Sequence, residues 1–305
     1  MQIEPYGSLD LPELYERLVA PTLDEMIDRW LAEDLGDVGD ITTLSLVAPD
    51  LETRCEVRAR AHGVASGLPV LERMIGRRGG LLRAEPLAAD GDRIEPGMRV
   101  MEVVGPLSAL LPMERVALNL LGRLSGVATA TRRFVDLIAG TGAVIVDTRK
   151  TTPGLRVLEK YAVRCGGGHL HRIGLFDGVL VKDNHIAAID DHELAPAVEA
   201  LAEAARHHGG ARFIEVEVDR LEQLDSLLTL PDGVLDIILL DNMSPSMIRE
   251  AVARRDKTRR DVLLEASGGI RLDTLRAVAE AGVDRIAVGA ITHSAVQVDF
   301  GLDSV

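Results

Sequence analysis

From residue 143 onward the chain alternates short apolar runs with amphipathic helical patterns, and this alternation constrains the fold more than any other feature. The runs are AVIVD (143–147), GVLVK (178–182), FIEVE (213–217), DIILL (236–240), VLLEA (262–266) and RIAVG (285–289). Patterns such as SPSMIREAVARR separate most of them. Apolar strands joined by helices predict a parallel sheet that is covered by those helices. Six such units in about 150 residues fit one closed or nearly closed α/β barrel better than two domains.

The first 105 residues follow a different plan. TRCEVRARA (53–61) and RVMEVVG (99–105) read as antiparallel strands, and Gly and Pro turn signals surround them. A helical pattern over residues 110–140 then leads into the repeating part. The N-terminal part is therefore predicted to be a small α/β unit of its own.

These two plans predict an α/β protein with two domains. The first is a smaller, sandwich-like N-terminal α/β domain over residues 1–115, and the C-terminal tail 294–305 is a candidate to join it. The second is a TIM-like catalytic barrel, complete or incomplete, over residues 116–293.

Composition excludes several kinds of partner. The formal net charge of −14 argues against nonspecific binding to nucleic acid or to an anionic membrane, and eight aromatic residues offer little for base stacking. No apolar run approaches the roughly 18 residues of a spanning helix, and MQIEPYGSLDLPELYERL has neither a signal core nor a transit pattern. Two cysteines do not make a disulfide framework. We therefore expect a cytoplasmic globular protein without nucleic-acid or membrane partners.

Polar residues gather where the apolar runs end. In chain order they are Asp147-Thr148-Arg149-Lys150, Lys182-Asp183-Asn184, Glu217 with Asp219, Asp241-Asn242, Ser267-Gly268-Gly269 and Gly289-Ala290. In barrels of this kind the active site lies at the carboxyl ends of the strands. The collection of polar residues at one end of six strands predicts an active site there.

Cations dominate the first two strand ends. Arg149 and Lys150 are adjacent, and the next ten residues contain one acid, Glu159. The pattern from Thr152-Pro153 to Gly166 predicts a helix whose N-terminus would follow the two cations and favour an anion. His171-Arg172 and Lys182 complete four cations and one histidine within 34 residues of an acidic chain. This set predicts a substrate with several negative charges, since Arg and Lys both bind carboxylates and phosphates.

Acids and glycines complement the cations. Glu215 and Glu217 share one face of a strand, and Asp241 ends the next. These carboxylates could hold ribose hydroxyls or a partly hydrated Mg²⁺; alternatively, they pair with the same cations. The last two strand ends, Ser267-Gly268-Gly269 and Val288-Gly289-Ala290, precede helices and are candidates to bind phosphate through backbone amides.

A transition-metal site is not expected. His169, His171 and His185 lack the compact spacing of a zinc site, and the chain contains no CxxC.

The motifs that carry this chemistry resemble quinolinate phosphoribosyltransferases. The resemblance lies in DTRKTTPGLRVLEKYAVRCGGGHLHR, KDNHI, EVEVD, LLDNMS, EASGGI and VGAITHSA, and extends to EDLGDVGDITT and ERVALNLLGRLSGVATAT. It covers most of residues 28–300. One departure is Leu170, where the family usually has asparagine before the His-Arg pair.

The resemblance implies a reaction and a set of residues. Quinolinate would attack phosphoribosyl pyrophosphate, pyrophosphate would leave with Mg²⁺, and loss of CO₂ would give nicotinate mononucleotide for NAD biosynthesis. The resemblance also implies a dimer, or an oligomer of dimers, in which Arg115 reaches the partner's site. It implies catalytic roles for Lys150, Glu217 and Asp241, substrate contacts by Arg115, Thr148, Arg149, Lys150, His171, Arg172, Lys182, Glu217 and Asp241, and a metal held by Glu217 and Asp241.

Three alternatives stay open at this point. A paralogue associated with molybdate transport shares the framework and acts on another substrate, although the retained cations disfavour it. A phosphate-binding barrel isomerase would use the loops at Ser267 and Val288 but would leave Arg149-Lys150 and His171-Arg172 without a role. A nucleotide-binding regulatory protein would not need Glu217 and Asp241 opposite the cations. Turnover of quinolinate discriminates among them.

Overall fold

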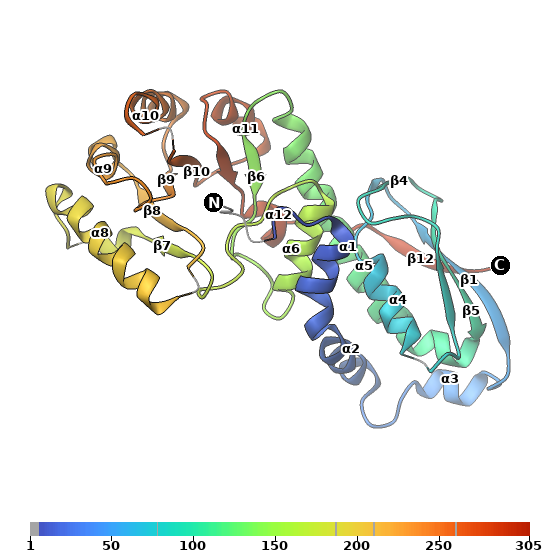
Figure 1. Cartoon of the computed structure of the whole chain (residues 1–305). Helices are drawn as coiled ribbons and strands as arrows, with labels where there is room; N and C mark the ends of the chain where they lie inside the picture. Colours follow the sequence, from blue (N-terminus) through green and yellow to red (C-terminus); the bar gives the residue numbers. More distant parts are fainter. Residues whose placement is uncertain (1–5, 78, 187, 210, 260) are drawn as a thin grey trace. The chain divides into compact units, whose positions relative to one another are not determined.

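The chain folds into two compact units (Figure 1). The computed structural model describes residues 6–77, 79–186, 188–209, 211–259 and 261–305; the first five residues of the N-terminal stretch considered above lie outside this set. One unit contains Arg133–Thr151 and Gly168–His293, and the other contains Ser8–Arg132, Thr152–Gly167 and Ser294–Val305. The expected boundary between residues 115 and 116 falls inside a long helix of the second unit.

The first unit is built on a parallel sheet. Within the described residues its strand order is β6-β11-β10-β9-β8-β7, and every neighbouring pair is parallel. The strands are β6 (Val144–Val146), β7 (Val179–Val181), β8 (Ile214–Val218), β9 (Ile237–Asp241), β10 (Leu263–Ser267) and β11 (Arg285–Ala287). Each lies at or within one residue of a predicted apolar run, so the α/β class and the barrel-like order are confirmed. Val146 also forms an isolated parallel bridge with His169, on the edge of β6 that no described strand covers.

The helices that follow the strands of this unit are α7 (Asp183–Ile186), α8 (Asp191–His208), α9 (Leu221–Leu227), α10 (Pro245–Thr258), α11 (Leu272–Ala279) and α12 (Ala290–His293). Helices α8 to α11 form the outer layer of this unit (Figure 1). Helix α10 begins as its sequence predicts, because the Ser244 hydroxyl accepts a hydrogen bond from the Met247 amide and Pro245 occupies the first turn. The apolar sides of α8 to α11 supply buried residues such as Val198, Leu224 and Leu275. No helix among the described residues has the length and apolar character needed to cross a membrane.

The register of the sheet places the strand-end residues side by side. Glu217 lies opposite Leu239, Leu239 lies opposite Glu265, and Glu265 lies opposite Arg285. Because side chains alternate between the two faces of a strand, these residues share one face of the sheet. Asp241 lies two residues beyond Leu239 and therefore shares that face at the carboxyl end.

The second unit contains an antiparallel sheet in the order β12-β1-β5-β3, and β2 pairs with β4. Its strands are β1 (Glu52–Ala59), β2 (Gly63–Val64), β3 (Arg83–Pro86), β4 (Arg93–Ile94), β5 (Arg99–Pro106) and β12 (Phe300–Ser304). Its helices are α1 (Leu11–Leu14), the π-helical turn η1 (Tyr15–Val19), α2 (Ala20–Leu35), α3 (Ile41–Leu46), α4 (Leu68–Gly76), α5 (Leu107–Leu137, whose last residues lie in the first unit) and α6 (Arg156–Cys165). The predicted antiparallel strands and the long helix are confirmed.

The C-terminal tail fits this second unit because α5 carries two glycines four residues apart. A Cβ on Gly126 would lie 2.4 Å from the Val296 carbonyl oxygen, and one on Gly122 would lie 2.7 Å from that of Val298. The Val298 amide donates to the Gly122 carbonyl at 3.0 Å. The tail therefore packs directly against the helix backbone before β12 pairs with β1.

Candidate active site

The segment after β6 supplies the first group of predicted site residues. Asp147 is fully buried, and its Oδ1 accepts a 2.7 Å hydrogen bond from the His171 amide. Thr148 Oγ1 accepts from the Lys150 amide at 3.0 Å, which fixes the turn after the strand. Asp147 therefore holds the chain near His171.

Arg172 is a buried cation, and Arg149 is a half-buried cation of like charge near it. Arg149 Nε is buried and has no hydrogen-bond partner among the described residues. Arg172 is 6% exposed, and its Nη1 donates to the Gly178 carbonyl at 2.9 Å. Burial, reinforced by the nearby charge of Arg149, lowers the pKa of Arg172. An anionic ligand at this point would relieve both effects, since an opposite charge stabilises the protonated form.

Glu159, the one acid in the ten residues after Lys150, is not a partner for those cations. Its Oε1 accepts from Arg123 Nε and Nη2 at 3.0 and 2.7 Å, and its Oε2 accepts from the Thr152 amide at 3.1 Å. The glutamate is fully buried in the second unit.

The helix expected from Thr152-Pro153 begins only at Arg156, so its N-terminus does not directly follow Lys150. Gly154 has a φ of +81°, outside the right-handed helical region, and it delays the start of the helix. The left-handed residue at the other end is Gly167 rather than the expected Gly166. The argument that this helix dipole favours an anion beside Lys150 therefore loses its premise.

Acids line a pocket at the carboxyl ends of β8 and β9. The pocket has a volume of about 280 Å³, and its carboxylates come from Asp183, Glu217, Asp219 and Asp241. Lys182 Nζ lies 2.8 Å from Glu217 Oε2, and the lysine is about half exposed. The structure thus brings Glu217 and Asp241 to one pocket and places Lys182 on its glutamate. A cation that binds Glu217 would compete with this ion pair.

Asn242 joins Asp241 to the Ser267-Gly268-Gly269 loop. It has a φ of +54°, a left-handed value that asparagine tolerates better than most residues. Its Nδ2 donates to Asp241 Oδ2 at 2.7 Å, and its amide donates to the Ser267 carbonyl at 2.9 Å. A Cβ on Gly268 would lie 2.3 Å from Asn242 Oδ1. Glycine at 268 is therefore required for the asparagine to sit here.

The second predicted phosphate loop, Val288-Gly289-Ala290, lies against Lys150. A Cβ on Gly289 would lie 3.0 Å from Lys150 Cδ, and Thr292 Oγ1 donates to the Lys150 carbonyl at 2.8 Å. The end of β6 and the start of α12 therefore hold the lysine stem between them. The lysine side chain emerges next to a loop that was predicted to bind phosphate.

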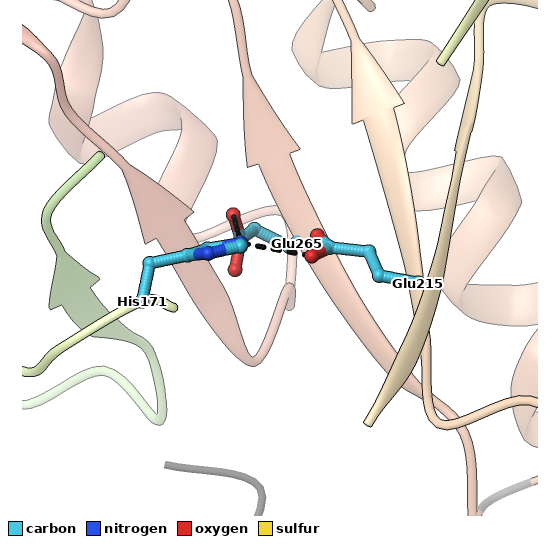
Figure 2. A group of neighbouring side chains, drawn as sticks. All are labelled: His171, Glu215 and Glu265. Carbon is cyan, nitrogen blue, oxygen red and sulfur yellow. Dashed lines mark ion pairs between the residues drawn. The ribbon is translucent and has the colours of Figure 1, made fainter. Parts of the chain in front are cut away.

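His171 differs from the other predicted ligands because both of its ring nitrogens already contact protein atoms, and Figure 2 shows the two glutamates that Nε2 faces. Nδ1 accepts a 2.8 Å hydrogen bond from the Arg172 amide. Nε2 lies 2.8 Å from Glu215 Oε2 and 3.6 Å from Glu265 Oε1. The ring also packs edge-on against Phe213, with centroids 5.5 Å apart. A direct bond from this ring to substrate would require one of these contacts to break.

Glu215 and Glu265 form an acidic pair in the interior of the sheet. Burial raises the pKa of Glu215 to about 8, and it also raises the pKa of Glu265. Neither Glu215 oxygen has a well-aligned hydrogen-bond donor among the described residues, although His171 Nε2 is at contact distance. Arg285 Nε donates to Glu265 Oε2 at 2.8 Å and offsets one of the two charges.

His171, Glu215 and Glu265 are also the one set of three ligand-type residues that come together in the part of the chain that the structure describes. Their chemistry does not fit a metal site. A neutral imidazole that binds a metal through Nε2 carries its proton on Nδ1, but Nδ1 here accepts the Arg172 amide proton. The set fits a hydrogen-bonded cluster instead.

Two predicted positions remain, Arg115 and Leu170. Arg115 is an exposed residue of α5 in the second unit, where it lines a pocket of about 200 Å³ with Asn119 and Gln297. Its role in a partner's site stays a prediction. Leu170, the position that departs from the family pattern, is fully buried in the first unit.

Glu265 and Arg285 were missed by the sequence reasoning, as was Asp183 as a pocket acid. A signal was present, because each of the mostly apolar runs VLLEA and RIAVG contains one charged residue. A charge inside a core strand needs a buried partner of opposite charge, so the presence of each residue predicted the other as its partner.

Models of two protein families match this chain. The model described as quinolinate phosphoribosyl transferase, C-terminal domain, matches residues 127–303, and that of the N-terminal domain matches residues 40–125.

Individual proteins are similar over nearly the whole length. A nicotinate-nucleotide pyrophosphorylase [carboxylating] of Mycobacterium leprae is 44% identical over 283 residues, which cover 92% of this chain and 96% of that protein. A probable enzyme of the same description from Bacillus subtilis is 38% identical over 281 residues, which cover 92% and 93%. The crystal structure of nicotinate-nucleotide pyrophosphorylase from Ehrlichia chaffeensis superimposes with a TM-score of 0.83 at 39% identity and covers 92% of this chain and 98% of its own.

Proposed function

The chain belongs to the quinolinate phosphoribosyltransferase family, and we propose that it transfers the phosphoribosyl group of phosphoribosyl pyrophosphate to quinolinate. The products would be nicotinate mononucleotide, pyrophosphate and CO₂. The protein is then a decarboxylating pentosyltransferase of NAD biosynthesis. The observation that carries the proposal is the pair of like charges formed by half-buried Arg149 and buried Arg172, because Arg149 Nε is buried without a hydrogen-bond partner among the described residues.

Quinolinate binding is assigned to the cations after β6 and before β7. Arg149 and Arg172 are suited to carboxylates because a guanidinium donates two parallel hydrogen bonds to one carboxylate. Thr148, Lys150 and Lys182 are proposed to complete the substrate contacts. A site of several cations discriminates against nicotinate, which has one carboxylate fewer, because each lost charge leaves a buried cation without its partner.

Phosphoribosyl transfer is assigned to the opposite side of the site. We place the phosphate groups on the amides of the loops at Ser267–Gly269 and Val288–Ala290, beside the Lys150 stem. Glu217 and Asp241 face the pocket where the sugar would bind, and their negative charge would stabilise an oxocarbenium-like transition state. In the absence of substrates, Lys182 forms an ion pair with Glu217.

Mg²⁺ is proposed to accompany the pyrophosphate group. Glu217 and Asp241 offer the oxygen ligands that Mg²⁺ prefers, and it is usually held by one or two carboxylates together with substrate phosphates. When bound, the ion would neutralise charge on the leaving pyrophosphate. Glu217 and Asp241 would then hold it directly, through water or through substrate.

Loss of CO₂ requires little from the cations. Transfer of the ribosyl group makes the pyridine nitrogen positively charged, and this charge favours departure of the adjacent carboxylate. Cations that hold this carboxylate equally well before and during bond cleavage do not lower the barrier. We therefore assign positioning to Arg149 and Arg172.

We also propose a two-fold dimer, alone or in a larger assembly, in which Arg115 of one subunit serves the site of the other. A cytoplasmic location is proposed as well, because Cys55 and Cys165 are both free thiols.

The test is turnover by the purified protein. Quinolinate, phosphoribosyl pyrophosphate and Mg²⁺ should give nicotinate mononucleotide and CO₂ in equal amounts, and chelation of Mg²⁺ should stop the reaction. Nicotinate in place of quinolinate is the matched control and should react poorly. Equal or faster turnover of nicotinate would contradict the assignment of quinolinate as the substrate.

A further inference from the structure

Three charged residues lie buried inside otherwise apolar strands of the parallel sheet. Glu215 lies on β8, Glu265 on β10 and Arg285 on β11; both glutamates are fully buried, and Arg285 is nearly so. Glu265 and Arg285 are in register and joined by a 2.8 Å hydrogen bond. Glu215 precedes Glu217 by two residues on one strand, so it lies roughly 7 Å deeper. None of the three is placed to touch a substrate at the strand ends.

His171 lies against the two glutamates (Figure 2) and directly precedes Arg172, the residue proposed to bind quinolinate. Its Nε2 faces Glu215 and Glu265, and its Nδ1 accepts the amide proton of Arg172. Its own amide donates to Asp147. On one side the ring accepts a hydrogen bond from the main chain of Arg172, and on the other side two buried acids lie against it.

Buried carboxylates are costly, and a hydrophobic replacement often stabilises a core. Their presence here therefore requires a purpose beyond packing. We propose that Glu215, supported by Glu265 and Arg285, positions His171 so that the imidazole holds Arg172 in place for quinolinate. The inference rests on the proposed function. It makes His171 and Glu215 positioning residues that act through Arg172.

The tautomer of His171 is the physical link. Because Nδ1 accepts a hydrogen bond, it carries no proton, and the proton of the neutral ring lies on Nε2. A proton on Nε2 in a buried site needs an acceptor, and the glutamate oxygens at 2.8 and 3.6 Å are the acceptors within reach. Without that acceptor, the tautomer with its proton on Nδ1 becomes the more stable one. The proton on Nδ1 would then clash with the N–H of Arg172. The main chain at Arg172 would then shift, and the guanidinium with it.

The experiment replaces the acceptor Glu215 and measures the affinity of the protein for each of the two substrates separately. Glu215→Met keeps an unbranched side chain of similar length but cannot accept, whereas Glu215→Gln retains an acceptor oxygen. We expect Glu215→Met to weaken quinolinate binding by calorimetry about tenfold or more, with the affinity for phosphoribosyl pyrophosphate changed less than about threefold. Glu215→Gln should restore quinolinate binding to within about threefold of the wild type.

Asp236 supplies a matched control. It is a buried acid at the start of β9, on the opposite end of the sheet, where its Oδ2 accepts from the Ile214 amide at 2.7 Å. Asp236→Leu removes a buried acceptor and keeps the branched shape of the side chain. It should lower the melting temperature without changing the dissociation constant of quinolinate. An equal loss in Asp236→Leu and Glu215→Met would mean that both act through general destabilisation and would overturn the proposal.

Nitrogen-15 NMR of protein with labelled histidine measures the tautomer of His171 in the absence of substrate. The wild-type spectrum should show His171 with an unprotonated Nδ1, and Glu215→Met should change that signal; a His171→Gln variant assigns it among the eight histidines. A proton on Nδ1 in the wild type would overturn the proposal even if Glu215→Met does not fold. Wild-type protein that binds no quinolinate would overturn the proposed function and the positioning role together. Normal wild-type binding with an unaffected Glu215→Met variant would overturn the positioning role alone.

Discussion

Glu159 and Arg123 form a buried ion pair whose separation should destabilise the unit built on β1 and α5. The Glu159 side chain is fully buried, and that of Arg123 is 16% exposed. Two charge-assisted hydrogen bonds of 3.0 and 2.7 Å join them, and a third bond reaches Glu159 from the Thr152 amide. Each charge therefore depends on the other for its neutralisation.

The expected magnitudes follow from this burial. Glu159→Leu leaves a largely buried guanidinium without its carboxylate and should lower the free energy of unfolding by roughly 3–5 kcal/mol. Arg123→Leu leaves the fully buried carboxylate with the Thr152 amide and should cost a similar amount. The double variant buries neither charge. We expect it to lose only about 1–3 kcal/mol, the cost of the unpaired Thr152 amide.

Urea unfolding followed by tryptophan fluorescence measures these differences directly. Trp30 is the single tryptophan, and it lies on α2 in the same unit as the ion pair. Glu25→Gln serves as the control, because the Glu25–Arg29 pair on the same helix is more than 80% exposed. This variant should leave the midpoint unchanged. Strict additivity of the two single substitutions would refute the reasoning, since it would mean that the charges do not depend on each other.

Three further predictions concern the site and the thiols. Arg172→Ala should leave the fold intact and weaken quinolinate binding by roughly 2–5 kcal/mol, and unchanged affinity by calorimetry would place Arg172 outside the site. Inactive Arg115→Ala and Lys150→Ala chains should recover roughly a quarter of wild-type activity when they exchange subunits, because one site of each heterodimer then carries neither change. No recovery, with exchange confirmed by mass spectrometry, would exclude the shared site. Burial raises the pKa of the Cys165 thiol, so it should react with iodoacetamide at pH 8 only after unfolding; labelling of the folded protein at the rate of a free thiol would contradict this burial.

The sequence by itself determined the elements of the first unit and the end of the sheet where its polar residues collect. Apolar runs such as AVIVD and DIILL became β6 and β9 within one residue, because an uninterrupted apolar run can be buried on both faces only in a covered sheet. The pocket acids Glu217 and Asp241 were found for the same reason, since parallel strands end at a common edge. The roles assigned to the site residues remain predictions that the experiments above test.

Only the tertiary structure decided which charge pairs with which. Glu159 lies nine residues from Lys150 in the chain but binds Arg123, 36 residues away, and Glu265 pairs with Arg285 on the next strand. His171, counted among the ligands from its place in a motif, uses both ring nitrogens within the protein. Spacing along a chain gives the face on which a charge lies, whereas the partner of a buried charge depends on which strands and helices become neighbours. That choice is made by the packing of the whole unit, and residue order alone does not contain it.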